Sequence, residues 1–299
     1  LPSFYAHSTF SGAAPHAGQR RFICDVDQFA RLMEASSKAI DTVPGATIGI
    51  APHSLRAVTP SELTAIVALA KKGPVHIHVA EQVKEVEDCI AWCGQRPVEW
   101  LLANAPVDER WCLIHATHMT ETETTAVTKA GAVVGLCPIT EASLGDGIFP
   151  ARTFMNSNGR FGVGTDSNVL IGVADELRQL EYGQRLALRE RNVFAAGADV
   201  STGRALFEGA LRGGAQALAQ PTSGLAEGAR ADIVTLDATH PSLAGRTNDQ
   251  LVDGWIFASA HSAIDCVWAG GVKLVENGHH RLRAHAKQRF NSAMTKLLA

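Results

Sequence analysis

The sequence of 299 residues lacks the features that mark secreted or membrane-spanning proteins. Its six cysteines form no CxxC pair, which argues against a zinc ribbon and against a disulfide framework. No apolar run approaches the roughly 18 residues of a membrane span. The first residues also lack the basic, apolar and small-residue layout of a secretory signal. We therefore expect a cytoplasmic protein with reduced thiols.

An excess of charge of either sign is also missing. The chain has 27 Lys and Arg against 30 Asp and Glu, which gives a net charge of −3 and a pI near 6.5. This balance indicates neither nucleic acid nor an anionic membrane as a partner. No internal repeat or low-complexity segment occurs. With 46% hydrophobic residues and a mean hydropathy of +0.03, the composition suits a globular protein with a large core.

Short apolar runs alternate with amphipathic stretches over the first two-thirds of the chain. Strands that are apolar throughout and alternate with helices indicate a parallel sheet covered on both faces. Counting a strand end within residues 1–7, the pattern gives six βα steps, more than half of an α/β barrel. The predicted strands are 46–52, 75–80, 111–116, 132–138 and 161–165, and the predicted helices are 60–73, 83–104, 121–131, 174–192 and 201–219.

The pattern changes near residue 220. Residues 224–237 and 264–278 resemble short strands with glycine turns, and the basic, periodic C-terminus predicts a final helix. The expected domains are a partial (β/α) barrel that carries catalysis, a small β appendage and a C-terminal helix. We place them at 1–220, 221–281 and 282–299.

Ionisable side chains stand at the ends of four predicted strands. They are His53, the pair His78 and Glu81, His115, and Asp166. In an α/β barrel the carboxyl ends of the strands meet at one rim, which is where barrel enzymes have their active sites. Four strands that each deliver an imidazole or a carboxylate to one rim favour a functional site.

Some of these residues also have a structural interpretation. His76 shares a strand face with His78, and we expect it to be a polar support one layer deeper. His118 is open to either interpretation, and Asp166 could instead cap the next helix. Neutral imidazole and carboxylate bind Zn²⁺ or Fe²⁺, and such a metal lowers the pKa of bound water towards about 7. The residue types thus predict metal-assisted hydrolysis, in which Glu81 could shuttle a proton and Asp166 accept one from water.

Several motifs resemble the amidohydrolase superfamily, and within it the formimidoylglutamate deiminases. The motifs HxxE, His and Asp at strand ends are common to the superfamily, and APHSLRAVTP and TEASLGDGIFP are specific to the deiminases. The likeness covers essentially the whole chain and implies a (β/α)8 TIM barrel with a small C-terminal β appendage. The motifs that carry it are APHSLRAVTP, VHIHVAEQ, WCLIHATHMT, LCPITEASLGDGIFP, GVGTDSN and ELRQLEYGQRL.

The resemblance implies a role for each matching residue. His78 and Asp166 would be ligands of one divalent metal, zinc or else iron. Glu81 would be the proton shuttle, and His115 would orient and polarise the hydrolytic water. Asp166 would have a catalytic role as well as a ligand role.

The resemblance also implies the substrate. N-Formimino-L-glutamate would be hydrolysed to N-formyl-L-glutamate and ammonia, a step of histidine degradation, with His53 and Arg56 holding the substrate. Arg56 suits this role because the substrate carries two carboxylates, which arginine binds bidentately. The expected partner is this small molecule, with no nucleic acid and no membrane, and a homodimer is left open.

One departure from the family pattern keeps alternatives open. The family's metal site takes two further histidines from an HxH at the end of the first barrel strand, and no second HxH here could serve. The chain begins at what matches the end of the third strand, so we expect the first two strands to be absent and the chain to be a fragment or inactive. The alternatives are a superfamily deaminase acting on a nucleobase-like ring, and a non-catalytic barrel.

Overall fold

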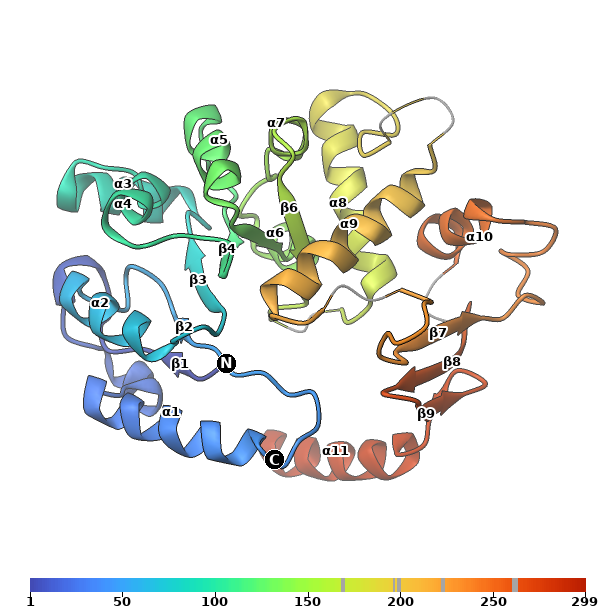
Figure 1. The fold of residues 1–299 in the computed structure, drawn as a ribbon, viewed down its shortest axis with the longest axis horizontal. Helices are drawn as coiled ribbons and strands as arrows, with labels where there is room; N and C mark the ends of the chain where they lie inside the picture. Colours follow the sequence, from blue (N-terminus) through green and yellow to red (C-terminus); the bar gives the residue numbers. More distant parts are fainter. Residues whose placement is uncertain (168–169, 196, 198–199, 222–223, 260–262) are drawn as a thin grey trace. The chain divides into compact units, whose positions relative to one another are not determined.

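The computed structural model describes residues 1–299 except 168–169, 196, 198–199, 222–223 and 260–262 (Figure 1). The chain divides into two compact units, Leu1–Thr222 and Ser223–Ala299, each of which is described by itself. In the described part of the chain, no helix combines the length and the apolar character needed to cross a membrane.

The first unit is built on parallel strands that follow one another in chain order. The strands are β1 (Ser3–Phe4), β2 (Ala51–Pro52), β3 (Val75–Val79), β4 (Trp111–His115), β5 (Val133–Leu136) and β6 (Arg160–Val163). Strands β3 to β6 form one four-stranded sheet, and β1 pairs with β2. Parallel bridges from Ile50 to Val75 and from Ser54 to His78 join the β2 segment to β3. Val79 pairs with His115, so β3 and β4 end at the same level.

Helices lie around these strands (Figure 1). Several begin at a sequence signal: Thr59 and Thr120 each form a capping box with the glutamate three residues later. The helices are α1 (Val26–Ile40), α2 (Pro60–Leu69), α3 (Val83–Cys93), α4 (Pro97–Asn104), α5 (Glu121–Ala130), α6 (Pro138–Leu144), α7 (Ala151–Asn156), α8 (Val173–Leu188) and α9 (Thr202–Ala217), with 3-10 turns at Phe10–Gly12 and Ala17–Phe22.

Helix α9 packs closely on β6. A Cβ atom at Gly213 would lie 1.9 Å from the Phe161 carbonyl oxygen, so only glycine permits this approach of helix and strand. Phe161 is buried, as are Val75, Ile77 and Leu113 of the neighbouring strands. These side chains form the core that holds the strand ends in place.

Most of the predicted elements are confirmed, and two predictions are wrong. The helix expected over 83–104 is divided into α3 and α4, because Gly94 takes a left-handed conformation (φ 75°) that ends the first helix. The strand expected over 46–52 is reduced to β2 and the Ile50 bridge. A Cβ atom at Gly49 would lie 2.2 Å from the Pro74 carbonyl oxygen, and Pro52 has no N–H to extend the pairing. Helices α1, α6 and α7 were not predicted.

The second unit contains an antiparallel sheet in the order β10-β9-β8-β7. Its strands are β7 (Ile233–Leu236), β8 (Ile264–Ala269), β9 (Val272–Glu276) and β10 (His279–His280), and its helices are α10 (Asp249–Asp253), a π-helical turn at Gly254–Ala258, and α11 (Arg283–Leu298). Gly270 and Gly271, both with positive φ, form the turn between β8 and β9. Helix α11 has no buried residue.

Candidate active site

The predicted site residues stand at the carboxyl ends of four parallel strands. His53 directly follows β2, His78 lies in β3 and Glu81 follows it, His115 ends β4, and Asp166 follows β6. Because the strands are parallel, all of these positions lie at the same edge of the sheet. The structure therefore brings the predicted residues together.

Three imidazoles line up across the ends of neighbouring strands. The ring centroids of His53 and His78 are 4.8 Å apart, and those of His78 and His115 are 5.6 Å apart. Tyr5 packs edge-on against His53, with centroids 4.7 Å apart. The Nδ1 atom of His78 lies 2.7 Å from the His53 carbonyl oxygen. Since a carbonyl only accepts, His78 carries a proton on Nδ1, and its Nε2 is the nitrogen available to a ligand.

His115 is the centre of the constellation. Its Nε2 lies 3.7 Å from Glu81 Oε1 and 3.7 Å from Asp166 Oδ2. Its Nδ1 lies 3.2 Å from Glu141 Oε1. The side chain is fully buried, and within the described residues Nε2 has no hydrogen-bond partner. A buried ring nitrogen aimed between two carboxylates is suited to hold a water or a reacting group.

Arg56 and Glu85 hold Glu81 in place, through its carboxylate and its backbone N–H respectively. The Nη2 atom of Arg56 donates to Glu81 Oε2 at 3.2 Å and lies 3.9 Å from Glu85 Oε2. Glu85 is 1% exposed and accepts the backbone N–H groups of Ala80 at 3.1 Å and Glu81 at 3.0 Å. These contacts fix the start of the loop that presents Glu81.

The backbone is strained where the strands deliver these side chains. Ala80, His115, Ala116 and Asp166 all have positive φ, at 51°, 66°, 49° and 37°. Such left-handed conformations cost non-glycine residues about 1–3 kcal/mol each and persist where surrounding contacts impose them. Their grouping after β3, β4 and β6 supports a functional use of this edge.

Burial and neighbouring charges shift the pKa values of the three histidines in different directions. Burial, with the positive charges of His78 and Arg56, lowers the pKa of His53 to about 4. Burial also lowers the pKa of His78. For His115 burial acts in the same direction, but the Glu141 hydrogen bond and the nearby carboxylates outweigh it and raise its pKa. His53 and His78 are thus neutral near pH 7, as metal binding or hydrogen-bond acceptance requires.

Two other histidines have backbone partners. His76 Nε2 lies 2.6 Å from the Ala217 carbonyl oxygen of α9, and His118 Nε2 lies 2.7 Å from the Asp146 carbonyl oxygen. Both contacts tie a strand or strand end to a distant segment. For His76 this agrees with a structural support.

Sequence reasoning missed Glu85 and Glu141. The signal for Glu85 was its spacing, four residues after Glu81 and on the first turn of a helix. For Glu141 the signal was its place within LCPITEASLGDGIFP, one of the motifs that carry the family resemblance. In both cases the glutamate contacts a site residue from another segment, Arg56 for Glu85 and His115 for Glu141.

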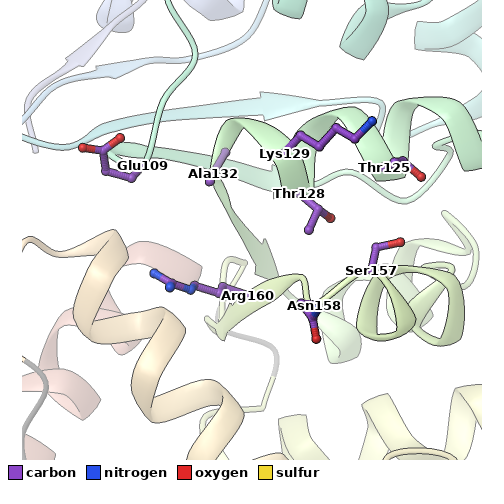
Figure 2. A pocket seen from close by; sticks show the side chains of 9 residues that line it. Glu109, Thr125, Thr128, Lys129, Ala132, Ser157, Asn158 and Arg160 are labelled. Carbon is purple, nitrogen blue, oxygen red and sulfur yellow. The ribbon is translucent and has the colours of Figure 1, made fainter.

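A pocket of about 570 Å³ lies at the opposite end of the sheet (Figure 2). Arg160 begins β6 and Ala132 directly precedes β5, so the pocket is at the amino ends of the strands. The side chains of Lys129 and Arg160 extend in opposite directions (Figure 2). The pocket is separate from the site above, and its lining residues are Glu109, Thr125, Thr128, Lys129, Gly131, Ala132, Ser157, Asn158 and Arg160.

Comparison with known proteins gives consistent matches. The model of the amidohydrolase family matches residues 12–274. Over all 299 residues the chain is 44% identical to formimidoylglutamate deiminase of Pseudomonas aeruginosa, and it spans 66% of that protein. It is 32% identical over 228 residues, 73% of the chain, to 5-methylthioadenosine/S-adenosylhomocysteine deaminase of Halobacterium salinarum, of which it covers 51%.

Solved structures are similar over the same extent. The crystal structure of an amidohydrolase from Brucella melitensis matches with a TM-score of 0.95 and 58% identity, covering 100% of this chain and 66% of that one. An adenosine deaminase from Xanthomonas campestris with bound zinc matches with a TM-score of 0.80 and 23% identity, covering 98% of this chain and 65% of that one. These matches confirm the predicted α/β fold of the TIM-barrel type, with its parallel sheet and additional antiparallel C-terminal sheet.

Proposed function

Because the chain belongs to the amidohydrolase family, we propose that it carries residues for the hydrolysis of N-formimino-L-glutamate to N-formyl-L-glutamate and ammonia, a step of histidine degradation. The similarity to the Pseudomonas formimidoylglutamate deiminase supports this substrate. The observation that carries the proposal is the approach of Glu81 and Asp166 to one buried nitrogen of His115, each at 3.7 Å.

His78 and Asp166 would hold a divalent metal, zinc or iron. The fit rests on His78, whose Nδ1–H is engaged by the His53 carbonyl so that Nε2 is left for a ligand. A bound metal would supply water activated near neutral pH. In the part of the chain that the structure describes, no three His, Cys, Asp or Glu side chains group as metal ligands. Since a catalytic zinc has at least three protein ligands, these two would bind it weakly.

The remaining residues would handle water and protons. His115 Nε2 would orient the attacking water, and Asp166 Oδ2 beside it would accept the water proton. Glu81 would carry a proton to the departing nitrogen, since Oε1 lies on the His115 side while Oε2 is held by Arg56. The two carboxylates thus both lie close to the nitrogen that would hold the water.

Arg56 and His53 would bind the substrate. The Arg56 side chain is 27% exposed, and one of its nitrogens contacts Glu81, so the rest of the guanidinium fork offers donors to a carboxylate. Arginine binds carboxylates bidentately, and the substrate has two of them. His53 lies on the same edge, stacked on His78. Arg56 and His53 would both belong to the partial barrel that the sequence predicts over residues 1–220.

Two substitutions separate binding from proton transfer. Arg56→Lys keeps the charge but loses the fork, so KM for N-formimino-L-glutamate should rise by an amount equivalent to about 1–3 kcal/mol. Glu81→Gln should preserve binding and lower kcat by roughly 10²–10⁴-fold. Both variants should bind added Zn²⁺ as the wild type does, because neither residue is a proposed ligand. Arg110→Lys is the matched control, because Arg110 also pairs with a carboxylate but precedes β4 at the far end of the sheet.

A deaminase acting on a nucleobase-like ring is the second candidate. The similarity to a protein named 5-methylthioadenosine/S-adenosylhomocysteine deaminase supports it. A neutral ring would be recognised by amide and carboxylate hydrogen bonds and would not need a cationic fork. Arg56→Lys with unchanged kinetics on N-formimino-L-glutamate, or a neutral nucleobase as the better substrate, would favour this candidate over the first.

A further inference from the structure

Glu141 lies in the first turn of α6, buried against the end of β4. Its side chain is 4% exposed. Its Oε1 accepts the backbone N–H of Cys137 at 3.0 Å and lies 3.2 Å from His115 Nδ1. One carboxylate oxygen therefore connects the start of α6 to the imidazole at the end of the neighbouring strand.

This contact determines which nitrogen of His115 faces the site. An ionised carboxylate only accepts hydrogen bonds, so the neutral imidazole keeps its proton on Nδ1 and donates it to Glu141. Nε2 then points to the space between Glu81 and Asp166, where it has no hydrogen-bond partner among the residues that the structure describes. Rotation of the ring by half a turn would exchange Nδ1 with Cδ2 and Nε2 with Cε1, so it would break the Glu141 contact and leave a carbon facing that space.

The ring of His115 is attached at the end of β4, where the backbone turns. His115 and Ala116 have φ values of 66° and 49°, so the strand ends in a strained turn. Glu141 reaches the ring from another segment, and its own position is fixed by the Cys137 N–H. A side chain held in this way can set both the tautomer and the direction of the imidazole.

We infer that Glu141 is a positioning residue, which holds His115 as the Nδ1–H tautomer and directs Nε2 towards the space between Glu81 and Asp166. The inference rests on the proposed function for the role of that space in hydrolysis. Glu141 itself is not placed against substrate or water, and it acts through His115. Its other contact, to the Cys137 N–H, would by itself make it only a helix-capping group.

The first test measures the His115 tautomer, which does not depend on any activity. In protein labelled with ¹⁵N-histidine, neutral wild-type His115 should carry its proton on Nδ1, with its signals identified by their loss in His115→Gln. In Glu141→Leu the tautomer should shift towards Nε2–H, whereas Glu141→Gln keeps an acceptor oxygen and should retain Nδ1–H. A neutral wild-type His115 protonated on Nε2 would overturn the inference, even if Glu141→Leu does not fold.

The second test is kinetic. With N-formimino-L-glutamate as substrate, Glu141→Leu should lower kcat by about 10- to 100-fold with little change in KM, and Glu141→Gln should recover part of the loss. Glu123→Gln is the matched control, because Glu123 is also a buried glutamate in the first turn of a helix and pairs with Arg96. It should leave kcat and the tautomer unchanged.

The two tests fail separately. If the wild type does not hydrolyse N-formimino-L-glutamate, the proposed function is wrong, and the tautomer measurement still decides the role of Glu141. If hydrolysis occurs but Glu141→Leu leaves both the tautomer and kcat as in the wild type, the proposed function stands and Glu141 is only a helix-capping group. An equal loss in Glu123→Gln would also overturn the inference, because it would show a general effect on stability.

Discussion

Glu176→Gln should change the way in which stability depends on pH. Glu176, in the first turn of α8, is 1% exposed; its Oε2 accepts the Ile139 N–H at 3.0 Å. Its Oε1 is buried without a hydrogen-bond partner among the described residues. Burial, with the charges of Glu141, Asp175 and Asp166, raises the pKa of Glu176 to about 7, although the Ile139 bond acts in the lowering direction.

The sign and size of this pH effect on stability follow from the linkage between proton binding and folding. A carboxyl group with a raised pKa binds its proton more tightly in the folded state. The stability it contributes is therefore present below the unfolded value of 4.5 and is lost as the pH rises through about 7. At about 1.4 kcal/mol for each pH unit, the loss is of the order of 3 kcal/mol. Glutamine keeps the acceptor for the Ile139 N–H and removes the charge, so the variant should not show this loss.

Urea denaturation at several pH values from 5 to 8 measures the effect. The free energy of unfolding of Glu176→Gln should exceed that of the wild type by roughly 3 kcal/mol at pH 8, and the difference should fall to about 1 kcal/mol or less at pH 5. Glu87→Gln, at an exposed position of α3, is the surface control and should show a small difference at every pH. A difference for Glu176→Gln that does not change with pH would refute the reasoning.

Two further predictions concern packing and metal. Gly213→Ala should destabilise the protein by about 1–3 kcal/mol or more, because the added Cβ would meet the Phe161 carbonyl oxygen. A Cβ at the neighbouring Gly214 would have no atom within 4 Å, so Gly214→Ala should stabilise the helix by about 0.5–1 kcal/mol. Equal melting temperatures for the two variants would contradict this. The 299-residue chain should bind Zn²⁺ weakly through His78 and Asp166, so stoichiometric zinc that survives dialysis against a mild chelator would be the contrary result.

The parts of the fold that follow from local sequence could be predicted. The apolar runs around His78 and His115 correspond to β3 and β4, and Pro60 marks the start of α2. Patterns with helical spacing do not show where a helix is interrupted, which is why the break at Gly94 was missed. The short β2 could not be predicted either, since the apolar pattern of residues 46–52 does not show how far the backbone pairing extends.

The candidate site could be predicted only as far as strand ends determine it. Residues at the ends of parallel strands share one edge, so the meeting of Glu81, His115 and Asp166 follows from their positions along the chain. The glutamates that support them, Glu85 and Glu141, lie on helices, and their partners depend on how each helix packs. Sequence periodicity does not contain that information.

Ammonia release from N-formimino-L-glutamate in the presence of excess Zn²⁺, measured beside adenosine at equal concentration, tests the central claim most directly. N-Formimino-L-glutamate should be hydrolysed and adenosine should not, and Glu81→Gln should abolish most of the turnover while substrate still binds. Hydrolysis of adenosine in preference to N-formimino-L-glutamate, or full turnover by Glu81→Gln, would contradict it.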